Sequence, residues 1–177
     1  TSLSGILPDD PRLTTKLCAP PARSDLVPRP HLAERMSQDL VGQAPGFARR
    51  LTVISAPAGF GKTTLAAAWL NSAQRPFSWL SLDEGDNDPA RFLAYLVAAL
   101  QTTDPAIGRA AQAMLKAPQP PPPEALLTSL INDIARTPTP FILVLDDYHV
   151  IRTLSIHRLL SFLVEHQPSS MHLTLAS

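Results

Sequence analysis

The chain has 177 residues, which is enough for one domain with a hydrophobic core. Its 15 lysines and arginines balance 15 aspartates and glutamates without a block of like charge, which argues against a nucleic-acid clamp with a basic face. No apolar run reaches the length of a membrane span and no charged-then-apolar leader opens the sequence, so we expect a protein of the reducing cytoplasm that makes no membrane contact.

The first 30 residues are rich in proline and show little apolar periodicity, which predicts an extended arm rather than a core element. Cys18 lies in this arm, and as the single cysteine it excludes an intrachain disulfide and a thiolate zinc site. Residues 31–42 then carry apolar side chains at helical spacing. We therefore divide the chain into an arm, 1–30, and one core domain, 31–177.

Apolar runs and amphipathic segments alternate along the core domain. The strands are predicted at 51–55, 77–82, 141–147 and 171–177. The helices are predicted at 62–71, 89–100, 105–116, 123–134 and around 156–163. Alternating helices and near-continuous apolar strands indicate a parallel sheet covered on both faces. The expected fold class is α/β in three α/β/α layers, with the first and third strands beside the last and the second strand toward one edge.

The proline-rich segment 117–124 reads APQPPPPE. Such a run is either a polyproline ligand for an aromatic groove or a stiff surface loop that begins the next helix at Pro123. We favour the surface loop.

A glycine-containing turn joins the first strand to its helix. The segment from Ala56 to Thr63, APAGFGKT, has the P-loop spacing with alanine in place of the first glycine. Its glycines let backbone N–H groups turn toward phosphate oxygens, and the positive end of the helix adds to the same anion site. The turn therefore predicts a binding site for the phosphates of ATP or ADP. The expected nucleotide-binding residues are Ala58, Gly59, Phe60, Gly61, Lys62, Thr63 and Thr64.

Four side chains predict how the phosphates and a magnesium ion are held. Lys62 would reach the β and γ phosphates, and the Thr63 hydroxyl would ligate Mg²⁺. The strand FILVLDD delivers Asp146, which would hold the same metal through water. Asp147 is the candidate catalytic residue, because its carboxylate can orient or deprotonate the attacking water.

Other polar residues also follow strands, where ligands bind in open α/β sheets. Asp83 and Glu84 follow the second strand, and we leave open whether they contact a ligand or cap a helix. Tyr148 and His149 follow the acidic pair; they either touch the γ phosphate or pack at the strand end, and we favour packing.

Three stretches together resemble one protein family. They read SAPAGFGKTTLAAAW, FSWLSLDEGDNDPARFLAYLVAAL and FILVLDDYHVI. They are similar to the nucleotide-binding domain of MalT-like, LuxR-type bacterial transcription activators, a NACHT/NB-ARC-like domain of the STAND branch of P-loop NTPases. The P-loop is generic, whereas WLSLDEGDND and DDYH are specific to this group. The resemblance runs from about Lys16 to the C-terminus and implies an AAA+/STAND-like form of the α/β/α fold.

The resemblance implies functional roles beyond the P-loop. It places Val27 and Arg29 of the arm against the adenine base. Family members carry an arginine that senses the γ phosphate just after the strand that ends here at Ser177, and continue into a further strand, a winged helix, a repeat-built sensor domain and a helix-turn-helix. We therefore expect a nucleotide-binding core truncated after the sensor strand.

The favoured function is a regulatory switch: ATP and ADP stabilise different arrangements of a larger transcription regulator, and slow hydrolysis resets it. The expected partners are the nucleotide and the other domains of the parent, whose ATP-bound form the resemblance allows to oligomerise; we expect no nucleic acid on this part. The alternative is a small P-loop kinase or phosphotransferase, which needs an acceptor pocket and an arginine-bearing lid. We expect a weak ATPase at most, because the arginine that senses the γ phosphate in the family would follow Ser177. Arg152 is the one internal candidate to stabilise the γ phosphate in its place.

Overall fold

The computed structural model describes residues 11–21, 30–38, 40, 46–57 and 59–177. Within them a four-stranded sheet has the order β1-β4-β3-β2, and every pair of neighbours is parallel. The strands are β1 (Leu51–Ile54), β2 (Phe77–Ser81), β3 (Phe141–Asp146) and β4 (Met171–Ala176). This order confirms the prediction that the last strand lies between the first and third, with the second at an edge.

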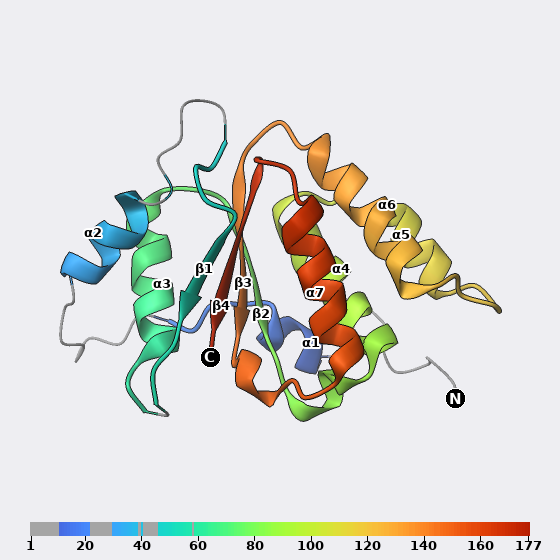
Figure 1. Ribbon diagram of the computed structural model, residues 1–177, viewed down its shortest axis with the longest axis horizontal. Helices are drawn as coiled ribbons and strands as arrows, with labels where there is room; N and C mark the ends of the chain where they lie inside the picture. The colour runs from blue at the N-terminus through green and yellow to red at the C-terminus, as the bar shows by residue number, and fades with distance from the viewer. Residues whose placement is uncertain (1–10, 22–29, 39, 41–45, 58) are drawn as a thin grey trace.

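Helices cover both faces of the sheet, so the predicted three-layer α/β/α fold is confirmed (Figure 1). One face carries α2 (Pro30–Gln38) and α3 (Lys62–Ala73). The other carries α4 (Pro89–Thr103), α5 (Arg109–Leu115), α6 (Pro123–Ala135) and α7 (Leu154–His166). None of the described helices combines the length and the apolar composition that a bilayer span requires.

The sheet separates two apolar cores because successive side chains of a strand point to opposite faces. In β3, Phe141, Leu143 and Leu145 belong to the core beneath α4 to α7, whereas Ile142 and Val144 belong to the core beneath α3. All six residues of β3 are buried. This two-sided burial explains why the strand reads as a continuous apolar run rather than an alternating one.

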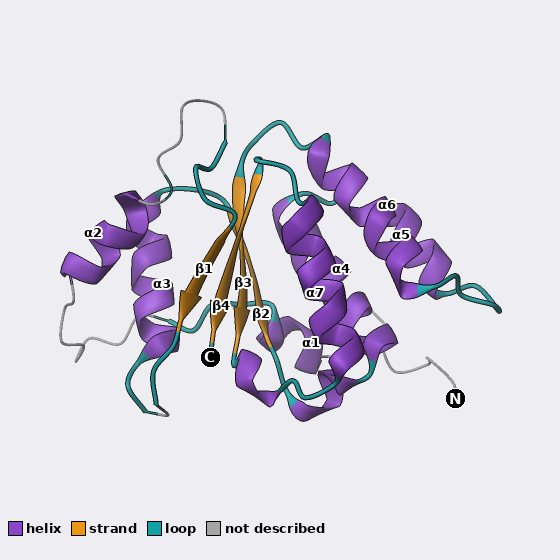
Figure 2. Ribbon diagram, in the orientation of Figure 1, coloured by secondary structure: helices purple, strands orange, loops and turns teal. Residues whose placement is uncertain are grey.

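All four strands end at the same edge of the sheet (Figure 2). The turn between β1 and α3 lies at this edge, as do two short 3-10 helices, η1 (Glu84–Asn87) after β2 and η2 (Tyr148–Val150) after β3. Ligands of open parallel sheets bind at this carboxyl edge. The fold therefore gathers the glycine-containing turn and the acidic pair in one region.

The expectation of an extended arm over residues 1–30 is wrong for part of that segment. Residues Pro11–Lys16 form a short helix, α1, which contacts β2. Cys18 follows it and is exposed, in agreement with a free thiol. The helix is too short to be stable alone, so its position depends on tertiary contacts.

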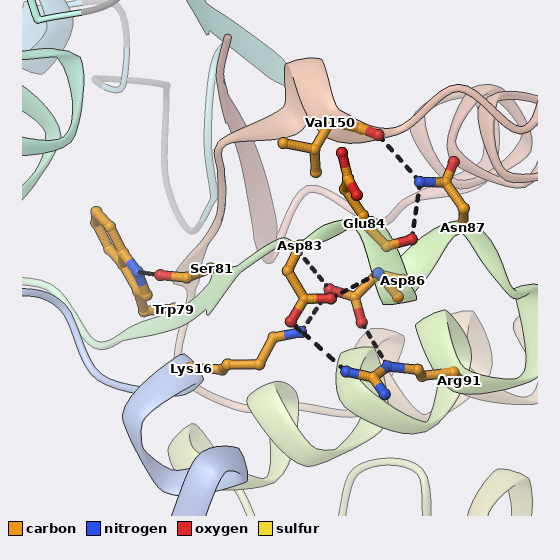
Figure 3. Close-up of polar contacts among 10 residues, drawn as sticks. Lys16, Trp79, Ser81, Asp83, Glu84, Asp86, Asn87, Arg91 and Val150 are labelled. Atoms are coloured by element: carbon orange, nitrogen blue, oxygen red, sulfur yellow. Dashed lines mark hydrogen bonds and ion pairs between the residues drawn. The ribbon is translucent and has the colours of Figure 1, made fainter.

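Those contacts centre on Asp86, a carboxylate that is fully buried (Figure 3). It accepts hydrogen bonds from Lys16 Nζ at 2.5 Å, from the Asp83 backbone N–H at 2.8 Å and from Arg91 Nε at 3.3 Å. Lys16 and Arg91 also lie over the ring of Tyr95, at 4.1 and 5.1 Å from its centroid. A buried charge needs such compensation, so this cluster attaches α1 to the start of α4.

Asp83 belongs to the same cluster and caps η1, because its carboxylate accepts a hydrogen bond from the Gly85 N–H at 2.8 Å. Partial burial raises the pKa of Asp83, but the hydrogen bond and the charge of Lys16, with the charge of Arg91, offset this and leave the pKa below its ordinary value. The structure thus supports the capping role that the sequence left open for this residue.

We expect Lys16→Met to lower the free energy of unfolding by about 1–3 kcal/mol, because it removes one of the two cations that compensate the buried Asp86. Urea denaturation at neutral pH measures this difference. Lys116→Met, at an exposed position after α5, is the matched control and should change stability little. Equal stability of both variants would show that Lys16 contributes nothing to the cluster.

Candidate functional site

The turn between β1 and α3 depends on two glycines in left-handed backbone conformations. Gly59 has φ 82° and Gly61 has φ 76°, values that strain residues with a Cβ. A Cβ at Gly59 would meet no atom within 4 Å, so the requirement for glycine there is conformational rather than steric. Gly61 caps α3 without a side-chain hydrogen bond. The N–H groups at the start of this helix are therefore not occupied by a capping side chain.

Lys62 is the first residue of α3, and its ammonium lies over the turn. Nζ donates hydrogen bonds to the backbone carbonyls of Ala56 at 2.7 Å and Pro57 at 3.3 Å. A flexible lysine exchanges such neutral acceptors for an anionic one at low cost, because the ammonium is attracted more strongly to a negative charge than to a carbonyl dipole. The cation is thus held beside the glycine turn.

The structure brings together the two residues that the sequence predicted as metal ligands. Thr63 lies in the first turn of α3 and Asp146 at the end of β3, and the Thr63 hydroxyl donates to Asp146 Oδ1 at 3.0 Å. The contact joins residues separated by 83 positions in the sequence. A hydroxyl and a carboxylate at one point are the ligand types that Mg²⁺ accepts alongside water and phosphate oxygens.

Asp146 is 2% exposed, and its surroundings disfavour its charge. Burial is the main cause that raises its pKa, and the charge of Asp147 acts in the same direction. The hydrogen bonds from Thr63 and from the Asp147 backbone and the charge of Lys62 oppose this rise without cancelling it. A carboxylate in this position is short of positive charge. A divalent cation beside it would supply that charge, so the buried pair fits a metal ion.

Asp147 follows in a conformation that few non-glycine residues adopt, with φ 56°. Its carbonyl accepts a hydrogen bond from the Val150 N–H at 3.0 Å, which closes η2. The Asp147 side chain is half exposed, and its Oδ1 lies 3.9 Å from His149 Nδ1. The strand end therefore presents one buried and one accessible carboxylate at adjacent positions.

These elements border a cavity of about 580 Å³ at the carboxyl edge of the sheet. The residues that line it are Ala56, Gly59, Gly61, Lys62, Thr63, Asp147, His149 and Ser177. The glycine turn with its cation supplies part of this lining, and the segment after β3 supplies Asp147 and His149. The turn is also tied to the end of β4, since the Ala56 N–H donates to the Ser177 carbonyl at 3.3 Å.

The other residues predicted for the nucleotide site either lie outside the described residues or do not line the cavity. Val27, Arg29 and Ala58 lie outside the described residues. Phe60 is 57% exposed at the tip of the turn, and Thr64 is half-buried in the first turn of α3. Neither Phe60 nor Thr64 is among the residues that line the cavity.

Of the two residues that follow the acidic pair, one packs against α7 and the other lines the cavity. Tyr148 makes a hydrogen bond with His157 of α7, and the two rings meet edge to face, as expected for a packed strand end. His149 instead lines the cavity. Arg152 does not line it, and its backbone N–H donates to Asn87 Oδ1 at 2.7 Å.

Asn87 is a functional candidate that the sequence alone does not reveal. It stands in the polar segment DEGDND, and no apolar periodicity or motif distinguishes its side chain from its neighbours. The structure shows that this side chain binds the segment after β3, which supplies one wall of the cavity. The signal that could have found it is the position of the segment at the carboxyl end of a parallel strand.

Comparison with known proteins agrees with this geometry. The AAA ATPase domain family matches residues 26–176. The chain is 41% identical to the HTH-type transcriptional regulator MalT of Cronobacter sakazakii over 126 residues, which are 71% of this chain and 14% of that protein. The MalT proteins of Klebsiella pneumoniae and Yersinia enterocolitica are 40% and 41% identical over 128 residues, again 14% of each protein. These matches support a MalT-like, regulatory nucleotide-binding domain.

The raised pKa of Asp146 predicts a pH-dependent effect of Asp146→Asn on stability without ligand. The folded protein keeps the Asp146 proton at pH values where the unfolded chain has released it, so wild-type stability falls as pH rises from below about 3.9 through the raised native pKa. Asparagine keeps an acceptor for Thr63 and carries no charge. We expect the variant to be more stable than wild type at pH 7 and to lose this advantage at pH 4.

Urea denaturation at the two pH values, in the presence of EDTA, measures the effect. Glu165→Gln, an exposed carboxylate on α7, is the control and should show no such pH-dependent gain. An Asp146→Asn protein that is less stable than wild type at pH 7 would contradict the account.

Proposed function

The chain belongs to the AAA ATPase domain family, and from this premise we propose that it is the ATP- and ADP-binding switch domain of a MalT-like transcription regulator. The observation that carries the proposal is the hydrogen bond between Thr63 and Asp146 beside the glycine turn. It joins the start of α3 to the end of β3, the two places that a magnesium-bound nucleotide needs. The cavity of about 580 Å³ next to it has room for a ligand of that class.

The residues of the turn would bind the phosphates. Backbone N–H groups around Gly59 and Gly61 and the open end of α3 form an anion site, and Lys62 would move from the carbonyls of the turn to the β and γ phosphates. Thr63 and Asp146 would hold Mg²⁺, with Asp146 acting through water. The metal, when bound, neutralises charge on the β and γ oxygens.

Within the described residues, no group of three or more His, Cys, Asp or Glu side chains forms a metal site by itself. This is consistent with magnesium in a nucleotide site, because Mg²⁺ is commonly held by one or two carboxylates together with substrate phosphates and water. The nucleotide would therefore complete the metal site rather than enter one already formed.

A switch requires ATP and ADP to favour different arrangements of the whole protein. Asp147 and His149 line the same cavity as Lys62, and the proposed role of Asp147 toward the attacking water would put them beside the γ phosphate. The chain spans 14% of the length of the curated relatives it matches, and control of transcription belongs to the proposed whole protein. The proposed partners are its winged-helix, repeat-sensor and helix-turn-helix domains, with oligomerisation in the ATP-bound form.

The adenine base would be held by Val27 and Arg29, as the resemblance implies. This part of the proposal rests on the family pattern alone. Fluorescence titration of Val27→Ala and Arg29→Ala with ATP and with inorganic triphosphate tests it, because loss of affinity confined to ATP would identify a contact to the nucleoside.

We propose slow hydrolysis, with Asp147 orienting or deprotonating the attacking water. Among the described residues that line the cavity, Lys62 is the one side chain with a permanent positive charge. Stabilising the charge on the γ-phosphate oxygens during hydrolysis usually needs an arginine as well. The same observation gives no support to the kinase alternative, which would need arginines over the phosphates.

We expect Lys62→Ala to weaken binding of Mg-ATP about tenfold to a hundredfold, since the phosphates lose their main compensating cation. Titration with a fluorescent ATP analogue measures the dissociation constant. The matched control is Lys116→Ala, which removes an exposed lysine far along the chain from the turn. Wild-type affinity in the Lys62→Ala protein would contradict a phosphate role for this lysine.

We expect the chain to hydrolyse ATP more slowly than about 10⁻² s⁻¹, the rate of GTPases that supply an arginine to the γ phosphate. Asp147→Asn should lower this rate further and leave ADP affinity within about twofold. Single-turnover assays with excess protein measure the hydrolysis rates of the wild-type chain and of Asp147→Asn. Rapid multiple-turnover hydrolysis would instead show that a cation of this chain serves the γ phosphate, and Arg152→Ala would then be the next variant to measure.

A further inference from the structure

Asn87, the last residue of η1, connects two loops at the carboxyl edge of the sheet. Its Nδ2 donates hydrogen bonds to the carbonyls of Glu84 at 3.1 Å and Val150 at 3.0 Å (Figure 3). Its Oδ1 accepts hydrogen bonds from the backbone N–H groups of Arg152 at 2.7 Å and Thr153 at 3.0 Å. The amide therefore uses its donors and its acceptor on backbone groups, three of them more than 60 positions away.

Thr153 completes the connection from the other side. It is the N-cap residue of α7, yet its side chain makes no capping hydrogen bond to the helix. Its hydroxyl instead donates to the Asn87 carbonyl at 2.9 Å and lies 3.0 Å from Asn87 Oδ1. The start of α7 is thus held by Asn87 rather than by its own cap.

The segment held in this way is the one that carries the accessible cavity wall. This segment begins at Asp147. Val150, three positions later, is the first of its residues that Asn87 binds. Asp147 and His149 lie inside it, and both line the cavity. Their side chains are about half exposed, so packing of the side chains themselves fixes them little. Their position depends on where the backbone of this segment is attached.

The residue that attaches the segment is itself held firmly. Asn87 ends η1, whose first residue follows the N-cap Asp83, and Asp86 of η1 is the buried carboxylate paired with Lys16 and Arg91. Both ends of η1 are therefore bonded, one to the charge cluster and the other to the segment after β3. An anchor of this kind restricts motion of the segment because both partners have defined positions.

We propose that Asn87 is a positioning residue: its amide fixes residues 150–153, and through them it sets where Asp147 and His149 stand relative to the terminal phosphate of a bound nucleotide. The proposal rests on the proposed function of the cavity as a nucleotide site. Asp147 and His149 line the same cavity as the glycine turn, and the proposed role of Asp147 toward the attacking water puts this segment beside the third phosphate. Asn87 therefore affects discrimination between triphosphate and diphosphate more than it affects diphosphate binding.

The test compares Asn87→Ala with Thr153→Val, which removes the reciprocal hydroxyl at nearly constant volume, and with the double variant. Asn132→Ala, an exposed asparagine on α6, is the matched control. Asn87→Asp keeps the acceptor for the N–H groups of Arg152 and Thr153 but loses the donor to Val150, so it should restore part of the effect. Circular dichroism and thermal melts check that each variant is folded.

The first measurement is hydrogen exchange of the peptide 147–153 without nucleotide. We expect exchange to speed up about tenfold in Asn87→Ala, as for the loss of one net hydrogen bond, and to stay unchanged in Asn132→Ala. The double variant should exchange fastest, because Asn87→Ala leaves the hydrogen bond from the Thr153 hydroxyl to the backbone carbonyl of residue 87 and the double variant removes this bond as well. Unchanged exchange in both single variants would overturn the proposal.

The second measurement is the dissociation constant for Mg-ATPγS and for ADP. We expect Asn87→Ala to change the ratio of the two constants about threefold to tenfold while ADP affinity stays within about twofold, with Asn87→Asp intermediate. A role in stability alone would lower the melting temperature and leave the ratio unchanged, and that outcome would overturn the proposal. Failure of the wild-type protein to bind either nucleotide would instead refute the proposed function.

Discussion

Parallel pairing of β1, β4 and β3 is the constraint on which the site depends. Parallel strands end at the same edge of a sheet, so the turn after β1 and the carboxylates after β3 emerge side by side with only β4 between them. The first turn of α3 then places the Thr63 hydroxyl 3.0 Å from Asp146 Oδ1. An antiparallel arrangement of the same strands would place these two residues at opposite edges.

When no ligand is bound, the acidic site lowers the stability of the fold. Asp146 is buried, its pKa is raised, and among the described residues its hydrogen-bond donor from a side chain is a neutral hydroxyl rather than a cation. Such a group opposes folding until positive charge arrives beside it. In the switch domain proposed above, this arrangement would couple binding of nucleotide and metal to stability, since whatever supplies the missing charge also stabilises the fold.

A second buried carboxylate, Asp86, has the opposite character. It is compensated within the protein by Lys16 and Arg91, and it needs no ligand. Its cluster attaches α1 to the sheet edge and supports the loop from which Asn87 reaches the segment after β3. One acidic loop thus serves as structural support, while the acidic pair after β3 remains available for chemistry. The two groups differ in whether a cation of the chain lies within hydrogen-bond distance.

The sequence by itself determined the elements and the main contacts of the site. Apolar periodicity identified the strands and most helices, because burial on one or both faces imposes a period of 2 or 3.6 on local sequence. The P-loop spacing and the apolar strand before Asp146 predicted that Thr63 and Asp146 serve one metal ion and so lie at the same edge of the sheet, and the structure places the two side chains together. The resemblance to MalT-like domains supplied the family.

Only the tertiary structure decided how α1 and the loop after β2 are held. Lys16 meets Asp86 across 70 positions and Asn87 meets Thr153 across 66, and neither pair leaves a periodic or local pattern in the sequence. Polar residues in such loops read as solvated surface until a partner is seen. These residues meet their partners only after the sheet has brought distant segments together. Their contacts therefore depend on the fold of the whole chain and not on any one stretch of sequence.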